Sequence, residues 1–227
     1  MGRMDSMDTA RAIVTALRDS GVQHVVIGPG SRSAPLVYAL AEAADPKTLR
    51  LHVRIDERSA AFTAMGIALA SGHPAAVVTT SGTAAGNLLP AMMEASHADI
   101  RLVAVTADRP TEVQCTGANQ TTDQRNIFGV HARTSVTVTG DTSDYAKTHA
   151  VVVGALAVGA GTASPPTGPV HINVRFREPL IPQPDALAVV PEAETGVLPV
   201  LQPGQGQPRF TVDKRWQIGR ASCRERV

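Results

Sequence analysis

The stretch 51-LHVRIDERSAAFTAMGIALASG-72 joins a mostly apolar segment to an alanine- and glycine-rich helical pattern through the charged triplet 56-DER-58. An apolar segment that leads at once into a helix is typical of a buried strand and its covering helix. Small residues recur on one face of this helix, between Ala60 and Ala68. Such a face permits close approach of another helix, so we expect it to contact a second subunit.

The rest of the chain also alternates between apolar segments and helical patterns. Apolar segments typical of strands lie at 24–33, 49–55, 75–80, 101–107, 134–139 and 169–174. Helical patterns lie at 8–20, 34–43, 60–71, 82–97 and 143–160. Strands that are apolar throughout and alternate with helices indicate a parallel sheet covered on both faces. We therefore predict a doubly wound α/β domain over residues 1–182, with a mostly parallel six-stranded sheet and helices on both faces.

The end of the chain has a different composition. Residues 183–217 are rich in proline and glycine and lack sustained periodicity, which predicts a linker toward a further domain. Residues 218–227, IGRASCRERV, have no apolar pattern. They resemble a translated sequencing-library adapter, so we expect a non-native tail.

Charge and cysteine content narrow the classes of partner. The formal net charge is +1, which gives no electrostatic reason to expect nucleic acid or an anionic membrane surface as a partner. The two cysteines, Cys115 and Cys223, cannot form a disulfide framework or a four-ligand zinc site. No apolar run reaches the length of a membrane-spanning helix. We expect a cytoplasmic protein that binds neither nucleic acid nor membranes.

Four polar clusters fall at the carboxyl ends of predicted strands. They are Gly28–Ser33, Asp56–Arg58, Thr79–Asn87 and Thr106–Pro110. Ligands of open α/β sheets bind outside the carboxyl ends of the strands. The coincidence of these clusters on one edge therefore predicts a binding site there.

Three of these clusters allow a functional interpretation and a plainer one. Arg32, at a helix N-terminus, could bind a carboxylate, or it could lie in water beside a tight turn capped by Ser33. Gly82 could let a flat ligand approach the backbone, although Ser81 or Thr83 could instead cap the following helix. The Asp–Arg pair that includes Arg109 could be a solvated ion pair.

Glu57 is the strongest candidate for a functional residue. A carboxylate at the top of a close helix contact would be partly desolvated, with a raised pKa. The alternative is a surface acid paired with Arg58 or Arg54. Asn119 and Gln120, in the loop 117-GANQ-120, could orient a polar substrate or belong to an ordinary polar loop.

Six motifs in order carry a family resemblance over residues from about 10 to 180. They are PGSRSAPL, RIDER, TSGTAxxN, TADRP, GANQ and GPVHINV. Together they resemble the 2-succinyl-5-enolpyruvyl-6-hydroxy-3-cyclohexene-1-carboxylate synthase family of menaquinone biosynthesis, and the domain resembles the pyrimidine-binding domain of thiamine-diphosphate enzymes. The resemblance implies a transferase that decarboxylates 2-oxoglutarate and adds the succinyl unit to isochorismate.

The resemblance also implies roles for particular residues. Glu57 would hydrogen-bond the pyrimidine ring of thiamine diphosphate and activate it, with Ser81, Gly82 and Asn119 as further cofactor contacts. Substrate contacts would come from Ser31, Arg32, Arg109, Asn119 and Gln120. The catalytic set would be Glu57, Arg32 and Gln120, and the chain would be a homo-oligomer through the Ala60–Ala68 face.

Family members hold the cofactor diphosphate and Mg²⁺ or Mn²⁺ in a C-terminal domain, through a Gly-Asp-Gly motif. No Gly-Asp-Gly occurs in this chain, so we expect no metal ligand in it and negligible turnover by the fragment alone. Two alternatives remain open. The chain could be the pyrimidine-binding subunit of a split decarboxylase or acetolactate-synthase-like enzyme, or a non-catalytic dimerising module.

Overall fold

The computed structural model describes residues 5–140, 144–162 and 166–182. The predicted linker 183–217 and tail 218–227 lie outside the described residues. The domain boundary at residue 182 therefore stays a prediction.

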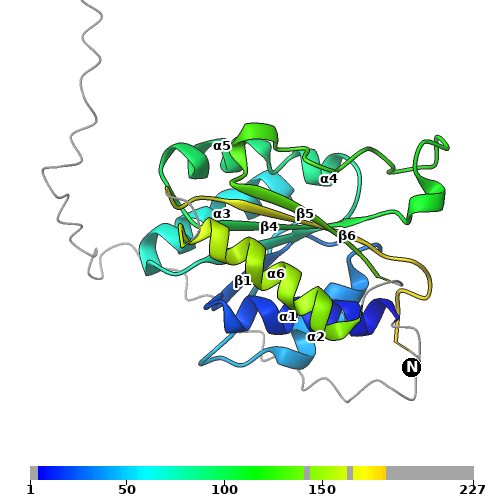
Figure 1. The fold of residues 1–227 in the computed structure, drawn as a ribbon, viewed down its shortest axis with the longest axis horizontal. Helices are drawn as coiled ribbons and strands as arrows, with labels where there is room; N and C mark the ends of the chain where they lie inside the picture. The colour runs from blue at the N-terminus through cyan, green and yellow to red at the C-terminus, as the bar shows by residue number, and fades with distance from the viewer. Residues whose placement is uncertain (1–4, 141–143, 163–165, 183–227) are drawn as a thin grey trace, which may run out of the picture. The chain divides into compact units, whose positions relative to one another are not determined.

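A six-stranded parallel sheet forms the centre of the fold (Figure 1). Its strands are β1 (His24–Ile27), β2 (Arg50–Val53), β3 (Ala75–Thr79), β4 (Leu102–Asp108), β5 (Thr134–Thr139) and β6 (Val170–Arg175). The spatial order is β2-β1-β3-β4-β6-β5, and every neighbouring pair is parallel. The predicted fold class is confirmed. Since β2 and β3 lie on opposite sides of β1, the order in which strands are added to the sheet reverses between β1 and β3. Such sheets bind ligands at this switch point.

Helices cover both faces of the sheet (Figure 1). The α-helices are α1 (Ser6–Asp19), α2 (Ala34–Ala43), α3 (Glu57–Ser71), α4 (Thr83–Gly86), α5 (Leu89–His97) and α6 (Tyr145–Gly159), with short 3₁₀ helices η1 (Thr111–Val113) and η2 (Gly129–His131). α1, α2 and α6 pack into one apolar core, and α3 and α5 into the other. None of the described helices is both long and apolar enough to cross a membrane.

The middle strand β4 shows why the central strands β3 and β4 are buried throughout, whereas the outer strands β2 and β5 are partly exposed. All seven of its residues are buried. Val103 and Val105 belong to the core with α1 and α6, whereas Leu102 and Ala104 belong to the core with α3. Because successive side chains point to opposite faces, a strand with a helix layer on each side needs apolar residues at every position.

The single helix predicted over residues 82–97 is two helices. α4 ends at Gly86, and α5 begins at Leu89 with Pro90 in its first turn. Proline has no backbone N–H to continue the hydrogen-bond ladder, and its ring clashes with the preceding turn. The break therefore falls just before Pro90 and leaves Asn87 at the junction.

The alanine-rich composition of α3 fits its position against the sheet. Asp56 is its N-cap and accepts a hydrogen bond from the Ser59 backbone N (2.7 Å). The alanines from Ala60 to Ala68 are buried in the core beneath the sheet. Their small size lets α3 lie close to its own sheet, which already covers these side chains. The contact of this helix with a second subunit stays a prediction. The apolar side chains left at the surface of α3 include Leu69, which is 59% exposed.

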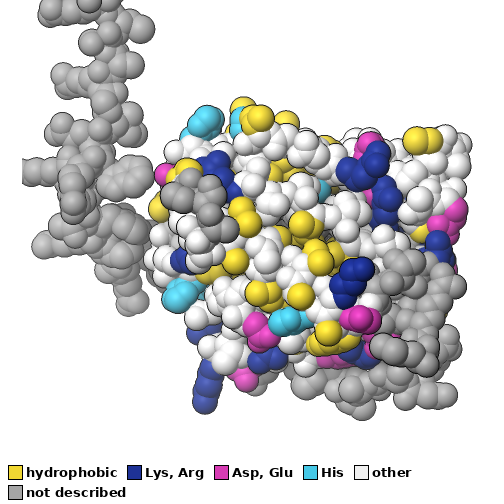
Figure 2. Space-filling model, in the orientation of Figure 1, with side chains coloured by type: hydrophobic (Ala, Val, Ile, Leu, Met, Phe, Trp, Pro, Cys, Tyr) yellow, Lys and Arg dark blue, Asp and Glu magenta, His cyan; other side chains and the backbone are white. Residues whose placement is uncertain are grey.

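The face of the molecule that includes α6 carries mixed side chains. Figure 2 shows basic and acidic side chains interspersed on this face, with apolar ones between them. Tyr145 and Val151 of α6 are among the exposed large apolar residues. No single sign of charge dominates this view of the surface.

Two histidines join the edge strand β2 to β1. Nδ1 of His24 lies 3.0 Å from Nε2 of His52, and the rings are stacked. One ring must stay neutral to accept the other's proton. Burial lowers the pKa of both histidines, and the nearby charge of Arg50 lowers each further.

We predict that acid weakens the fold through this pair. The unfolded chain binds these protons at the ordinary histidine pKa of about 6.5. A folded-state pKa below that value makes the unfolded state bind more protons, so the free energy of unfolding falls as pH drops through about 6.5. Urea unfolding from pH 8 to pH 5.5 measures this slope. His52→Gln should reduce this slope and leave the part due to His171, whose pKa burial lowers to about 4. His97→Gln, at an exposed site, should leave the slope unchanged; equal slopes in all three proteins would contradict the assignment.

Candidate functional site

The turns that follow β1 and β3 meet at the switch point. The backbone N of Gly28 donates to the carbonyl oxygen of Val78 (2.8 Å). A Cβ on Gly30 would lie 2.3 Å from Cβ of Thr80, which no real contact allows. Only a glycine lets the two turns lie this close. The structure thus brings the Gly28–Ser33 and Thr79–Asn87 clusters together, as the strand-end argument predicted.

Glu57 is the first residue of α3 and lies beside the β1 turn. A Cβ on Gly28 would lie 3.6 Å from Cγ of Glu57. The side chain is half-buried in the single chain, and its Oε2 accepts a hydrogen bond from Nδ2 of Asn87 (3.3 Å). Among the described residues, no ion pair joins Glu57 to Arg54 or Arg58; Nη1 of Arg54 donates to the Val53 carbonyl oxygen (2.8 Å).

Asn87 is a neighbour of Glu57 that the sequence interpretation did not select. It is the last residue of TSGTAxxN, and the break before Pro90 places it at the α4–α5 junction. Its position in that motif was the available signal, but its contact with Glu57 joins residues 30 positions apart. Glu57 follows β2 and Asn87 follows β3, so the contact depends on the parallel arrangement of β2, β1 and β3 beneath it.

The β3–α4 turn contains buried hydroxyl groups without partners. Within the described part of the chain, Oγ of Ser81 and Oγ1 of Thr79 are buried and make no hydrogen bond. An unsatisfied buried polar group costs about 1–3 kcal/mol, so a ligand that supplies a partner here gains stability. The alternative that Ser81 or Thr83 caps the helix is wrong, because the N-cap is Gly82 and no side chain caps α4.

Gly82 adopts a backbone conformation that favours glycine, with φ 80° and ψ −139°. A Cβ there would lie 3.2 Å from Cα of Gln120. The contact brings the β3–α4 turn against the loop that holds Asn119 and Gln120, both of which are exposed. Gln120 itself has a positive φ of 53°.

Arg32 is buried, so the alternative that places it in water is wrong. Its Nη1 donates to the Phe176 carbonyl oxygen (3.2 Å), and its Nη2 lies 3.3 Å from Oε1 of Glu178. Burial lowers its pKa, and the charge of Arg109 lowers it further. Ser33 is the N-cap residue of α2, but its side chain accepts no hydrogen bond from the helix; its Oγ donates to the Gly30 carbonyl oxygen (2.9 Å) and bonds the turn instead.

Arg109 also approaches the site from the end of β4. Its Nη2 donates to the Asn119 carbonyl oxygen (3.1 Å). Among the described residues, the buried Nε atoms of Arg32 and Arg109 have no hydrogen-bond partner. Two neighbouring guanidinium groups with unused donors favour an anion between them. Ser31 is exposed at the same turn as Arg32.

Asp108 differs most from its predicted environment. The Asp–Arg pair in TADRP allowed a solvated local ion pair, but Asp108 is fully buried. Its carboxylate accepts from the Arg109 backbone N (2.7 Å) and Asn173 Nδ2 (2.9 Å), and it lies 3.4 Å from Nε of Arg175. Because buried charges need this many partners, Asp108 anchors the end of the sheet on which the site rests.

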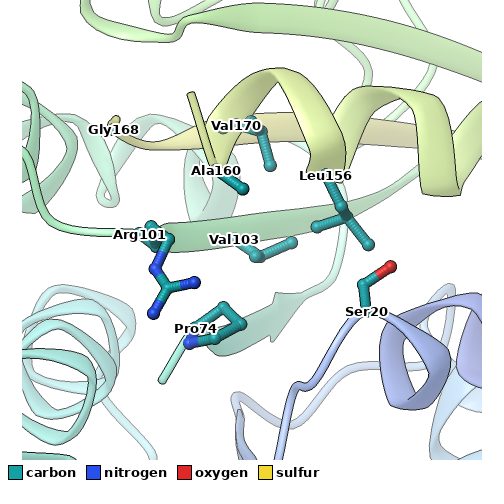
Figure 3. Close-up of a pocket in the computed structure, with 9 residues that line it drawn as sticks. Ser20, Pro74, Arg101, Val103, Leu156, Ala160, Gly168 and Val170 are labelled. Carbon is teal, nitrogen blue, oxygen red and sulfur yellow. The ribbon is translucent and has the colours of Figure 1, made fainter. Parts of the chain in front are cut away.

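Two hollows lie outside the switch point. The cavity in Figure 3 lies beside the amino-terminal ends of β4 and β6 and has room for about 20 Å³, roughly one water molecule. Arg101, Val103 and Leu156 are among its walls (Figure 3). A second hollow of about 160 Å³ lies beside the 114–125 loop, between Cys115 and Arg175. Within residues 5–140, 144–162 and 166–182, no three His, Cys, Asp or Glu side chains are grouped to hold a metal ion.

We predict that the close approach of the two turns is a condition of stability. Gly30→Ala places a methyl group against Thr80 and should lower the free energy of unfolding by about 1–3 kcal/mol, as overpacking does. Gly28→Ala is the matched control, because its Cβ would make an ordinary 3.5 Å contact with the Val78 carbonyl oxygen. Urea unfolding of both variants measures the difference; equal losses would contradict the contact.

Comparison with known proteins agrees with this geometry. Residues 7–127 match the family described as thiamine pyrophosphate enzyme, N-terminal TPP binding domain. The chain is similar to 2-succinyl-5-enolpyruvyl-6-hydroxy-3-cyclohexene-1-carboxylate synthases. It is 56% identical over 180 residues to that of Paenarthrobacter aurescens, covering 79% of this chain and 31% of the relative. It is 48% identical over 179 residues to that of Saccharopolyspora erythraea, covering 78% and 32%.

The chain thus spans about a third of the length of these curated relatives. The family match covers residues 7–127, more than half of the 227 residues in the chain, and includes the turns after β1, β2 and β3. The chain belongs to the thiamine pyrophosphate enzyme family and contains its N-terminal TPP-binding domain.

Proposed function

We propose that the chain is the N-terminal, pyrimidine-binding part of a 2-succinyl-5-enolpyruvyl-6-hydroxy-3-cyclohexene-1-carboxylate synthase. The observation that carries the proposal is the position of Glu57, beside the glycine turn of β1 and across from the unpartnered hydroxyls after β3. The similarity to synthases of that name over about 180 residues supports it.

The residues at the switch point fit the pyrimidine ring of thiamine diphosphate. The ring is flat and needs an acid at one ring nitrogen and polar partners at its edge. Glu57 supplies the acid, and the unpartnered Oγ of Ser81 supplies a polar group. Gly82 has no side chain to obstruct the turn, and Asn119 lies in the adjoining loop.

In this proposal Glu57 keeps a proton on its carboxyl group and donates it in a hydrogen bond to the ring nitrogen. When bound, thiamine diphosphate supplies the carbon that stabilises the charge left by decarboxylation. Asn87 holds the other side of the Glu57 carboxyl through its Nδ2. A second chain packed over the half-buried Glu57 would exclude water from this carboxyl group.

The proposed substrates are 2-oxoglutarate and isochorismate, both carboxylates. Arg32 and Arg109 would bind carboxylate oxygens through their Nε donors, which have no partner among the described residues. Ser31, Asn119 and Gln120 would orient the remaining polar groups. Glu178, now 3.3 Å from Arg32, occupies the kind of position that a substrate carboxylate would take.

Mg²⁺ or Mn²⁺ and the cofactor diphosphate would be held by residues outside this chain. We propose a homo-oligomer that uses the exposed side of α3, around Leu69, in place of the buried alanines. A cytoplasmic location fits the free and exposed thiol of Cys115.

We predict that Glu57 carries cofactor activation. In a chimera, residues 1–182 of this chain replace the matching part of the Paenarthrobacter aurescens synthase, and turnover of 2-oxoglutarate with isochorismate is measured. Glu57→Gln keeps the shape but cannot hold the same proton, so kcat should fall by about 10²-fold or more. Asp56→Asn is the matched control, because asparagine caps helices as well as aspartate, and it should cost less than tenfold.

Two outcomes would overturn the proposal. One is equal kcat in the Glu57→Gln and parent chimeras. The other is a parent chimera that converts pyruvate in preference to 2-oxoglutarate, which would favour the split acetolactate-synthase-like alternative. The 227-residue chain alone should show no turnover above background in the same assay.

A further inference from the structure

Gln124 lies where three parts of the candidate site meet. Its side chain is fully buried in the loop between β4 and β5. Its Oε1 accepts a hydrogen bond from the backbone N of Gly82 (2.9 Å). Its Nε2 donates to the Ala107 carbonyl oxygen (3.1 Å) and to Oδ1 of Asn173 (3.0 Å). One side chain therefore links the β3–α4 turn to the ends of β4 and β6.

The orientation of this amide is fixed by a charge. The Asp108 carboxylate only accepts hydrogen bonds, and it accepts one from Nδ2 of Asn173 (2.9 Å). Oδ1 of Asn173 must then face Gln124, and it also accepts from Oγ1 of Thr106 (3.0 Å). Gln124 must present its nitrogen to Asn173, which leaves its oxygen for Gly82. Donors and acceptors thus run in one order from Asp108 to Gly82.

The hydrogen bond from Gly82 to Gln124 fixes the separation between the β3–α4 turn and the loop that holds Gln120. The N–H of Gly82 is used by Gln124 and is not free for a ligand. Gly82 lies against the backbone of Gln120, where an added Cβ would be 3.2 Å from Cα. Gln120 and Gln124 belong to the same loop. Gln124 therefore holds its own loop and the Gly82 turn at a fixed distance from each other.

We propose that Gln124 is a positioning residue that aligns the cofactor and substrate subsites. The inference rests on the proposed function, in which Gly82 lines the cofactor slot and Gln120 faces the substrate. Gln124 touches neither ligand. It acts by fixing the gap between the two walls, and small errors in such a gap cause large losses in rate.

Gln124→Glu in the chimera tests this role. An ionised glutamate still accepts from Gly82 but repels the Ala107 carbonyl oxygen and Oδ1 of Asn173. A protonated glutamate donates its one proton to the Ala107 carbonyl oxygen or to Oδ1 of Asn173, and so restores a donor on this side of residue 124. Desolvation and the charge of Asp108 favour protonation, so kcat should fall at least about tenfold at pH 8 and recover toward the parent value at pH 6.

The other ionisable groups of this network are Asp108 and Arg109 on the β4 side, and His171 and Arg175 in β6. Burial lowers the pKa of His171 to about 4, so its ring stays neutral between pH 6 and pH 8. Each kcat is divided by that of the parent chimera at the same pH. Gln23→Glu, at an exposed glutamine, is the control and should show no recovery at low pH.

Amide hydrogen exchange in the 227-residue chain tests, without any catalytic assay, whether the Gln124 side chain holds the Gly82 turn. Gln124→Leu should speed exchange of the Gly82 amide at least about tenfold and leave that of Val77, in the middle of β3, unchanged. If Gln124→Leu does not fold, the Gly82-to-Val77 exchange ratio in Gln124→Glu at pH 6 and pH 8 replaces it. An unchanged ratio, or a Gln124→Glu rate profile parallel to the parent's, would overturn the inference. A parent chimera without activity would instead contradict the proposed function. The exchange rate of the Gly82 amide would still show whether Gln124 holds the Gly82 turn.

Discussion

The contact between the β1 and β3 turns is the constraint on which the site depends. Parallel strands bring their carboxyl ends to one edge, and the strand order reverses between β1 and β3. Gly30 and Thr80 leave no space for a side chain between the turns. Glu57 enters from β2 on one side, and Arg32 turns toward β6 on the other. The functional groups therefore surround a junction whose backbone cannot separate without loss of the fold.

A buried polar layer supports that junction from below. Asp108, Asn173 and Gln124 replace the apolar contacts found deeper in the sheet with hydrogen bonds. Such a layer is costly when incomplete and specific when complete, because each member fixes the orientation of the next. It explains why a charged residue ends the otherwise apolar strand β4. Beside this layer, the hydroxyl groups of Ser81 and Thr79 have no hydrogen-bond partner in the described part of the chain, so a ligand can complete the hydrogen bonding there.

Periodicity and turn chemistry predicted most of the fold. α2 has the predicted bounds, and the six parallel strands follow from apolar segments that only a doubly covered sheet can bury. Partners distant in sequence were not predictable. Asn173 reaches Asp108 across 65 positions, and no local pattern records that contact. The alanines of α3 were expected to contact a second subunit and are buried against their own sheet, because a row of alanines packs equally well against a sheet or a second helix.

The central claim concerns the distance from Glu57 to the pyrimidine ring. A crystal structure of the chimera with thiamine diphosphate measures it directly. The account predicts a Glu57 carboxyl oxygen within about 3.2 Å of a ring nitrogen, with Oγ of Ser81 facing the same slot. A pyrimidine ring bound away from the β1–β3 junction, with Glu57 turned toward solvent, would contradict it.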